Sequence, residues 1–151
     1  MSRAAAMRLL AALTMSLVLL PCCSGQAGGD DKEVRGFLEH YFSSWSAQDM
    51  DGYGACFHEK ARITFVTKDA HVDSMALTDF LHSQRMAHQT SPVRMNEVPL
   101  EMNIRLGRLI TQAAVNWKLT KGSEVNTGTD YFTLVKADGG WRIIALAFDQ
   151  D

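Results

Sequence analysis

The sequence predicts a single α+β domain in which three N-terminal helices pack in a strongly curved antiparallel sheet. The chain has 151 residues, 46% of them hydrophobic, which is enough for one domain with a real core. Before Pro92 the apolar residues recur with a helical period, and after it they alternate with polar residues as in strands. A wide aromatic stripe on the helical part needs a concave sheet to pack against, and the later strands supply one.

The first predicted helix begins near residue 31 and is marked by an apolar stripe. Apolar residues recur there at the spacing of one helix face: Val34, Phe37, Leu38, Tyr41, Phe42 and Trp45. Asp30 or Asp31 can cap its start, because a carboxylate accepts hydrogen bonds from the free N–H groups of the first turn. A second, short helix is predicted from Asp49, followed by a strand over residues 61–66.

A short hairpin and a third helix are predicted next. A second strand is expected around residues 70–75, joined to the first by a polar turn. Thr78 can serve as the N-cap of the third helix. That helix must end before Ser91-Pro92, because a proline disfavours the helical conformation of the residue before it.

From Val93 onward the period of the apolar residues changes to two. Val93 and Met95 are apolar at odd positions, whereas the apolar residues that follow them fall at even positions. This switch of parity beside Pro99 predicts a β-bulge at residues 96–98. Three further strands are expected, over residues 109–120, 125–136 and 141–148, and the glycines at residues 138–140 predict a tight hairpin between the last two.

The N-terminal residues 1–23 are predicted to be a signal peptide, followed by a linker over residues 24–30 and the domain over residues 31–151. Two arginines precede an apolar run over residues 9–20, which is shorter than a bilayer-spanning helix and is followed by a proline and small residues. We therefore expect export, in a bacterial cell either to the envelope or as a periplasmic or secreted protein.

Two adjacent cysteines lie at the end of the apolar run. Cys22 and Cys23 stand where bacterial lipoproteins are acylated, so either predicts a lipid tether to an envelope membrane. The alternative is ordinary cleavage after Ala27, which would release a free protein. Cys56, inside the domain, is interpreted as a small buried hydrophobe because no second cysteine there could pair with it.

Composition and motifs exclude several classes of function. The predicted mature chain has 13 basic and 17 acidic residues and no basic run, which argues against nucleic acid as a partner. The histidines form no i, i+4 pair and there is no CxxC motif, so no metal site is expected. Phosphate-binding, dinucleotide and nucleophile-elbow motifs are also missing from the sequence, and no cofactor is predicted.

Two stretches carry a resemblance to a known superfamily. The segment YFSSWSAQDMD at residues 41–51 and the segment DGGWRII at residues 138–144 resemble the nuclear transport factor 2-like superfamily, also described as SnoaL-like or cystatin-like. The resemblance covers about residues 33–149 and implies a cone with an apolar pocket at its open end. Members include isomerases, cyclases, dehydratases, epoxide hydrolases and non-catalytic binding domains, so the resemblance predicts the fold and not the function.

The catalytic members of that superfamily can be compared with this chain residue by residue. A steroid-isomerase-like site places an aspartate near the end of the first strand, where this chain has Thr64 and Phe65. The remaining candidates for proton transfer are Asp130 and the pair His71 and Asp73, which share one face of a strand. Asp130 would have a raised pKa if it faces the cone interior, and would be an ordinary polar residue if it faces outward.

The function favoured by the sequence is binding of a small apolar or aromatic ligand without catalysis. The alternative is a small lyase- or isomerase-like enzyme that uses Asp130 or His71 with Asp73. Five aromatic residues are candidates to contact the ligand, although ordinary core packing would also explain them: Tyr41, Trp45, Tyr53, Trp117 and Tyr131.

A homodimer is predicted through the outer face of the sheet. The last two strands carry apolar residues on both faces, as Tyr131 and Val135 alternate with Phe132 and Leu134. An antiparallel sheet normally exposes one polar face to water. We therefore expect the second apolar face to meet another subunit.

Overall fold

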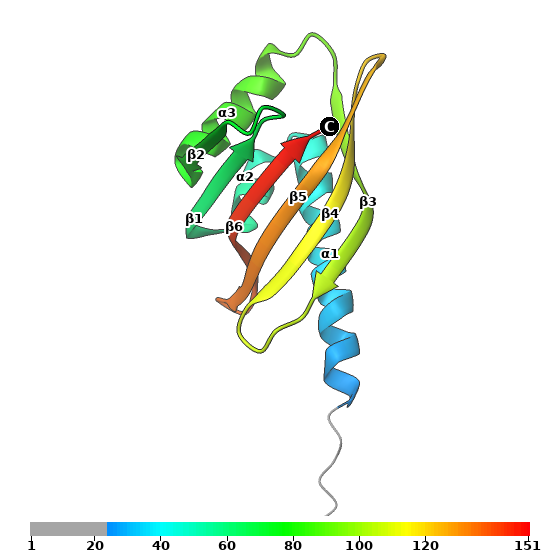
Figure 1. Cartoon of the computed structure of the whole chain (residues 1–151), viewed down its shortest axis with the longest axis vertical. Coiled ribbons are helices and arrows are strands. Elements are labelled where there is room, and N and C mark those ends of the chain that lie inside the picture. Colours follow the sequence, from blue (N-terminus) through cyan, green and yellow to red (C-terminus); the bar gives the residue numbers. More distant parts are fainter. Residues whose placement is uncertain (1–23) are drawn as a thin grey trace, which may run out of the picture.

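The computed structural model describes residues 24–151, which form three helices and one sheet of six strands. The elements follow in the order α1 (Ser24–Ala47), α2 (Met50–Ala55), β1 (Phe57–Val66), β2 (Val72–Ala76), α3 (Leu77–Thr90), β3 (Met95–Arg105), β4 (Thr111–Lys121), β5 (Glu124–Ala137) and β6 (Gly140–Gln150). The sheet is curved and open, with the strand order β2-β1-β6-β5-β4-β3, and α1 and α2 lie behind it in Figure 1. This architecture confirms the predicted α+β class.

The sheet is not wholly antiparallel, and this part of the prediction is wrong. Strand β1 pairs in parallel with β6, with Ile63 opposite Leu146 and Phe65 opposite Phe148. Every other neighbouring pair is antiparallel. The reason lies in the connection: β1 and β6 are joined by most of the chain, so no short hairpin forces them to run in opposite directions.

Helix α1 begins earlier than predicted, at Ser24, so residues 24–30 form its first turns instead of a linker. Neither predicted cap acts as one. The Asp30 carboxylate accepts a hydrogen bond from Lys136 Nζ at 2.7 Å, and the Asp31 carboxylate accepts one from Arg35 Nε at 2.7 Å. Asp31 thus forms an ion pair along the helix and Asp30 forms one with strand β5, and the helix continues N-terminally past both.

The predicted signal peptide and the two cysteines of the lipidation motif, Cys22 and Cys23, lie outside the described residues. Within residues 24–151, no helix is long and apolar enough to cross a membrane.

The predicted β-bulge is present but lies further along β3. The register between β3 and β4 shifts between Pro99 and Glu101, not at residues 96–98. Proline has no backbone N–H for the ladder, so the irregularity falls directly after it. Before this register shift the odd-numbered residues Met95 and Glu97 face the helices, and after it the even-numbered residues Met102 and Ile104 pack against the core.

The stripe on α1 forms the centre of the core, as predicted. Val34, Leu38 and Phe42 are at most 1% exposed, and they pack with inward residues of the sheet. The Tyr41 and Phe132 rings meet edge to face, with their centroids 5.1 Å apart. The helix and the concave sheet face therefore form one continuous apolar layer.

Cys56 is buried at the end of α2, as its interpretation as a core residue requires. It is 2% exposed, and its Sγ contacts the Gly52 carbonyl oxygen at 3.5 Å. Burial raises the pKa of the thiol to about 11, so it stays protonated and is a poor nucleophile near neutral pH.

Candidate functional site

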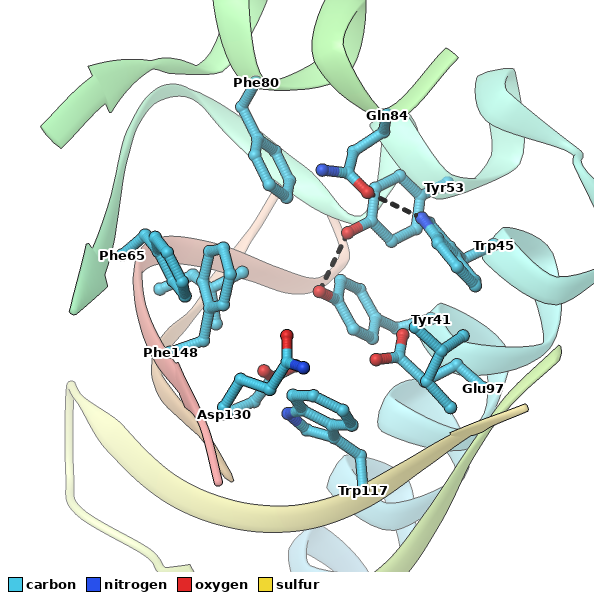
Figure 2. A pocket seen from close by; sticks show the side chains of 13 residues that line it. Tyr41, Trp45, Tyr53, Phe65, Phe80, Gln84, Glu97, Trp117, Asp130 and Phe148 are labelled. Atoms are coloured by element: carbon cyan, nitrogen blue, oxygen red, sulfur yellow. Dashed lines mark hydrogen bonds between the residues drawn. The ribbon is translucent and has the colours of Figure 1, made fainter. Parts of the chain in front are cut away.

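A cavity of about 150 Å³ lies between the helices and the curved sheet. Aromatic side chains form most of its wall, and Figure 2 shows them pointing into the same space: Tyr41, Trp45, Tyr53, Phe65, Phe80, Trp117 and Phe148. Its polar lining consists of four side chains: Gln84, Glu97, Asp130 and Gln150. The cavity is thus an aromatic pocket with two carboxyl groups and no basic side chain in its lining.

Of the five aromatic residues predicted to contact a ligand, four line this pocket. Tyr131 does not, because its side chain is 51% exposed on the other face of the sheet. The reason is the alternation of a strand: Asp130 points inward, so its neighbour Tyr131 must point outward. This part of the site prediction is wrong.

Asp130 lies inside the pocket and is 5% exposed. Burial raises the pKa of its carboxyl group well above the usual value, and the nearby charge of Glu97 adds to the rise. The Trp117 indole and the Tyr41 hydroxyl oppose this rise without reversing it. The Asp130 carboxyl group is therefore shifted toward its protonated form, in which it can donate a hydrogen bond into the cavity.

Two tyrosines stand beside Asp130 and are linked to each other. The Tyr53 hydroxyl donates a hydrogen bond to the Tyr41 hydroxyl at 2.9 Å, and both residues are at most 3% exposed. Burial raises the pKa of both phenols well above 10, so both keep their protons. Since Tyr41 accepts the bond from Tyr53, its own proton is free to be donated toward Asp130 or toward a bound molecule.

Trp117 completes this side of the pocket, and its position depends on a glycine. Trp117 on β4 is paired with Gly128 on β5, and a Cβ at position 128 would overlap the indole ring. Only glycine lets the ring lie across the neighbouring strand at this point. The indole Nε1 is buried and makes no hydrogen bond of normal geometry within residues 24–151, although it lies close enough to the Asp130 carboxyl group to favour its charged form.

Glu97 is a pocket residue that the sequence analysis did not identify. Its carboxylate comes from β3, and burial raises its pKa to about 7. The Ser46 hydroxyl fixes the backbone here, because it donates to the Glu97 carbonyl oxygen and accepts from the Glu97 N–H, each at 2.8 Å. The available signal was parity: Glu97 shares the odd positions of the buried Met95 before the bulge, and these are the inward positions of the first part of β3.

A family model described as "Putative lumazine-binding" matches residues 29–149 of the chain. The chain belongs to this family. A comparison with curated proteins finds no match. Many solved structures share the fold of this family member, and the fold that the nuclear transport factor 2-like resemblance implied is confirmed.

Three of these structures illustrate the match. A protein of unknown function from Mycobacterium tuberculosis is 18% identical over 83% of this chain and 74% of its own, with a TM-score of 0.69. An NTF2-like protein from Pseudomonas putida is 11% identical over 81% of this chain and 87% of its own, with a TM-score of 0.70. A cystatin-like protein from Nostoc punctiforme is 11% identical over 81% and 91%, with a TM-score of 0.64. At these identities the likeness shows the fold alone.

In this member of the lumazine-binding-like family, the other predicted proton-transfer groups lie away from the pocket. His71 and Asp73 are both exposed on the edge hairpin of β1 and β2, where the Thr67 N–H donates to the His71 carbonyl oxygen at 3.0 Å. They do not meet Asp130, because β2 is the outermost strand of the sheet. Phe65, at the position of the steroid-isomerase-like aspartate, lines the pocket as an aromatic wall.

Chemically, the pocket of this family member offers hydrogen-bond donors on one side and a carboxylate acceptor on another. Asp130, Tyr41 and Trp117 can donate, and Glu97 can accept. Within residues 24–151 no three His, Cys, Asp or Glu side chains lie close enough together to hold a metal ion. The pocket thus combines hydrogen-bonding groups of both kinds with an apolar wall.

Proposed function

We propose that the protein binds a small planar ligand with ring carbonyl groups in the aromatic pocket. The observation that carries this proposal is the placement of Asp130, Tyr41 and Trp117, three potential donors, on the wall of an otherwise apolar cavity. Buried polar groups without partners are costly, so a ligand oxygen that accepts from them gains specificity as well as affinity.

The size of the cavity limits the ligand to one or two rings. A cavity of about 150 Å³ accommodates a benzene-sized molecule, and because this pocket is open on one side a second ring can extend from it toward the mouth. Stacking against Trp45, Phe80 and Phe148 favours a flat aromatic ring over a branched aliphatic one.

The family description supplies a specific probe. Lumazine is a flat, two-ring heterocycle with two carbonyl oxygens and ring N–H groups. Its oxygens are acceptors for Asp130 and Trp117, and its N–H groups are donors for the Glu97 carboxylate. One molecule of this class thus matches both sides of the pocket.

The test is a titration with lumazine, followed by the ligand's fluorescence and by calorimetry. We expect Trp117→Phe, which keeps a ring but removes the N–H, to weaken binding about fivefold, the effect of losing about 1 kcal/mol of hydrogen bonding. The exposed Tyr131→Phe serves as the matched control and should bind as the wild type does. Native mass spectrometry of the purified protein searches in parallel for a retained ligand. Equal binding by wild type and Trp117→Phe, or binding lost only in Tyr131→Phe, contradicts the proposal.

The alternative function, a lyase- or isomerase-like enzyme, is supported by one observation. Asp130 faces the same cavity as Tyr41, which places an acid beside a second hydrogen-bond donor. The pair His71 and Asp73 gives it no support from its place on the exposed hairpin.

A further inference from the structure

We propose that the loop between β3 and β4, residues 106–110, docks onto the surface of an anionic phospholipid bilayer. Leu109 and Ile110 enter the headgroup region, while Arg105 and Arg108 contact lipid phosphates. This surface lies away from the aromatic pocket, and the inference does not depend on what that pocket binds.

The first argument is the exposure of two large apolar side chains at the tip of the loop. Leu109 is 73% exposed and Ile110 is 53% exposed. Gly107 closes the turn, because a Cβ at that position would overlap the Ile110 carbonyl oxygen. A stable protein interface buries about 800 Å² on each partner, more than two side chains at a tip provide, whereas a membrane interface accepts a small apolar surface.

The second argument is the charge beside these side chains. Arg105 and Arg108 are both exposed, and neither forms an ion pair within residues 24–151. Three acids in the first turns of α1 are already held in ion pairs: Asp30, Asp31 and Glu33. The predicted mature chain has more acidic than basic residues, so an anionic surface repels most of the molecule and attracts this loop.

The third argument is that the loop and the start of α1 lie at the same end of the molecule. Arg35 on α1 donates to the Met102 carbonyl oxygen on β3 at 3.2 Å, so the two elements are level there. From that point β3 runs on about 10 Å to Arg105, and α1 runs back about 16 Å to Ser24, at the ordinary rise per residue of each element. Figure 1 shows the loop and the start of α1 at its lower end.

The predicted lipid anchor joins the molecule at this end, which is why we choose a bilayer as the occupant. Cys22 and Cys23, the candidate acylation sites, directly precede Ser24, the first residue of α1. An acyl tether at either cysteine would raise the effective concentration of the loop at the membrane, so that even a weak contact is occupied.

Docking by this loop also fixes the orientation of the aromatic pocket. Leu119, which lines the pocket, lies about 26 Å along β4 from Thr111, the first residue after the loop. Gln150, also in the lining, is the last residue of β6. A protein docked in this way holds its pocket away from the bilayer, so a ligand reaches the pocket from water.

The test uses the mature full-length protein with vesicles whose acyl chains carry bromine, which quenches a nearby tryptophan. Leu109→Trp places the probe on the loop. Val125→Trp is the matched control, because Val125 is exposed where β5 begins, at the opposite end of the molecule. After subtraction of the wild-type fluorescence, we expect phosphatidylglycerol vesicles to quench the Leu109→Trp probe and to leave the Val125→Trp probe unquenched.

A second substitution in the Leu109→Trp protein tests the charge. Arg108→Gln should shift the loop from its docked to its free state about fivefold, the contribution of one arginine at an anionic surface. Lys68→Gln, in the exposed turn between β1 and β2, should leave the quenched fraction unchanged. Phosphatidylcholine vesicles should quench the loop probe less than phosphatidylglycerol vesicles do, and thermal unfolding shows that each variant is folded.

Three results overturn the inference. The first is equal quenching of the Leu109→Trp and Val125→Trp probes, or quenching of neither. The second is equal quenching by the two kinds of vesicle, because the arginines then recognise no anionic surface. The third is a blue shift of the Leu109→Trp emission that grows with protein concentration in the absence of lipid, because the loop then meets a second copy of the chain.

Discussion

Replacing Glu97 by glutamine tests the electrostatics of the pocket through stability alone, without any ligand. Burial raises the pKa of Glu97 from its ordinary value of 4.5 to about 7. A group whose pKa is raised by folding contributes its full stability below the unfolded pKa and loses it as the pH rises through the folded pKa. The wild type should therefore lose stability between about pH 4.5 and pH 7, and Glu97→Gln, which cannot ionise, should not lose it.

The size of the effect follows from the shift. A difference of about 2.5 pKa units, at 1.36 kcal/mol per unit, gives an upper value of about 3 kcal/mol. The titratable groups of the pocket whose charges interact with Glu97 are Asp130, Tyr41 and Tyr53, and the pocket lining has no cation to offset its charge. Arg94 lines a neighbouring hollow together with Glu97 and is the basic side chain nearest to it in the sequence. When Glu97 ionises, Asp130 is pushed further toward its neutral form, so the change in stability belongs mainly to Glu97.

The assay is urea unfolding of wild type and variant at several pH values across this window. Glu97→Gln should be the more stable protein on the alkaline side, by up to about 3 kcal/mol, and the two should converge on the acidic side. The exposed Glu101→Gln should show no such pH-dependent gain. If the difference between Glu97→Gln and wild type is the same at every pH, the carboxyl group is not desolvated and the reasoning fails.

Three further predictions test other parts of the molecule. Gly128→Ala should lower the stability of the fold by about 1–3 kcal/mol and weaken lumazine binding, because its Cβ would overlap the Trp117 ring. Thermal unfolding measures the stability and calorimetry the affinity, and an unchanged stability and affinity would refute the close approach of Gly128 to Trp117. Light scattering should show a dimer, and Tyr131→Glu should dissociate it by placing a charge on the outer face, so a monomeric wild type contradicts this proposal. Mass spectrometry of the exported protein should find an acylated N-terminal Cys22 or Cys23, whereas a retained Met1 would refute export.

The local elements could be predicted because each is encoded in residues close together in the sequence. The stripe from Val34 to Trp45 fixes which face of α1 is buried, and alternation fixes the strands after Pro92. The parallel pairing of β1 with β6 could not be predicted in the same way. It depends on which edges of the sheet remain free after the hairpins form, and no local period in the sequence carries that information.

The inward position of Asp130 was left open for a different reason. Both faces of β5 carry apolar residues, as Phe132 is 1% exposed on the inner face while Tyr131 is half exposed on the outer one. Periodicity shows that these two residues lie on opposite faces but does not say which face is the core. The position of helix α1 determines which face of β5 is the core face, because the Tyr41 ring packs against Phe132, which lies on the same face as Asp130.

Glu97 was missed because its environment exists only in three dimensions. Taken alone, it is one acid on a strand, and a solvated position is the usual explanation of such a residue. Glu97 belongs to the site because Asp130 lines the same pocket. The strands β3, β4 and β5 that carry Glu97, Trp117 and Asp130 are neighbours in the sheet. The lining of this pocket places no basic side chain beside the two acids, so they form no ion pair within it, and no local pattern in the sequence carries that information.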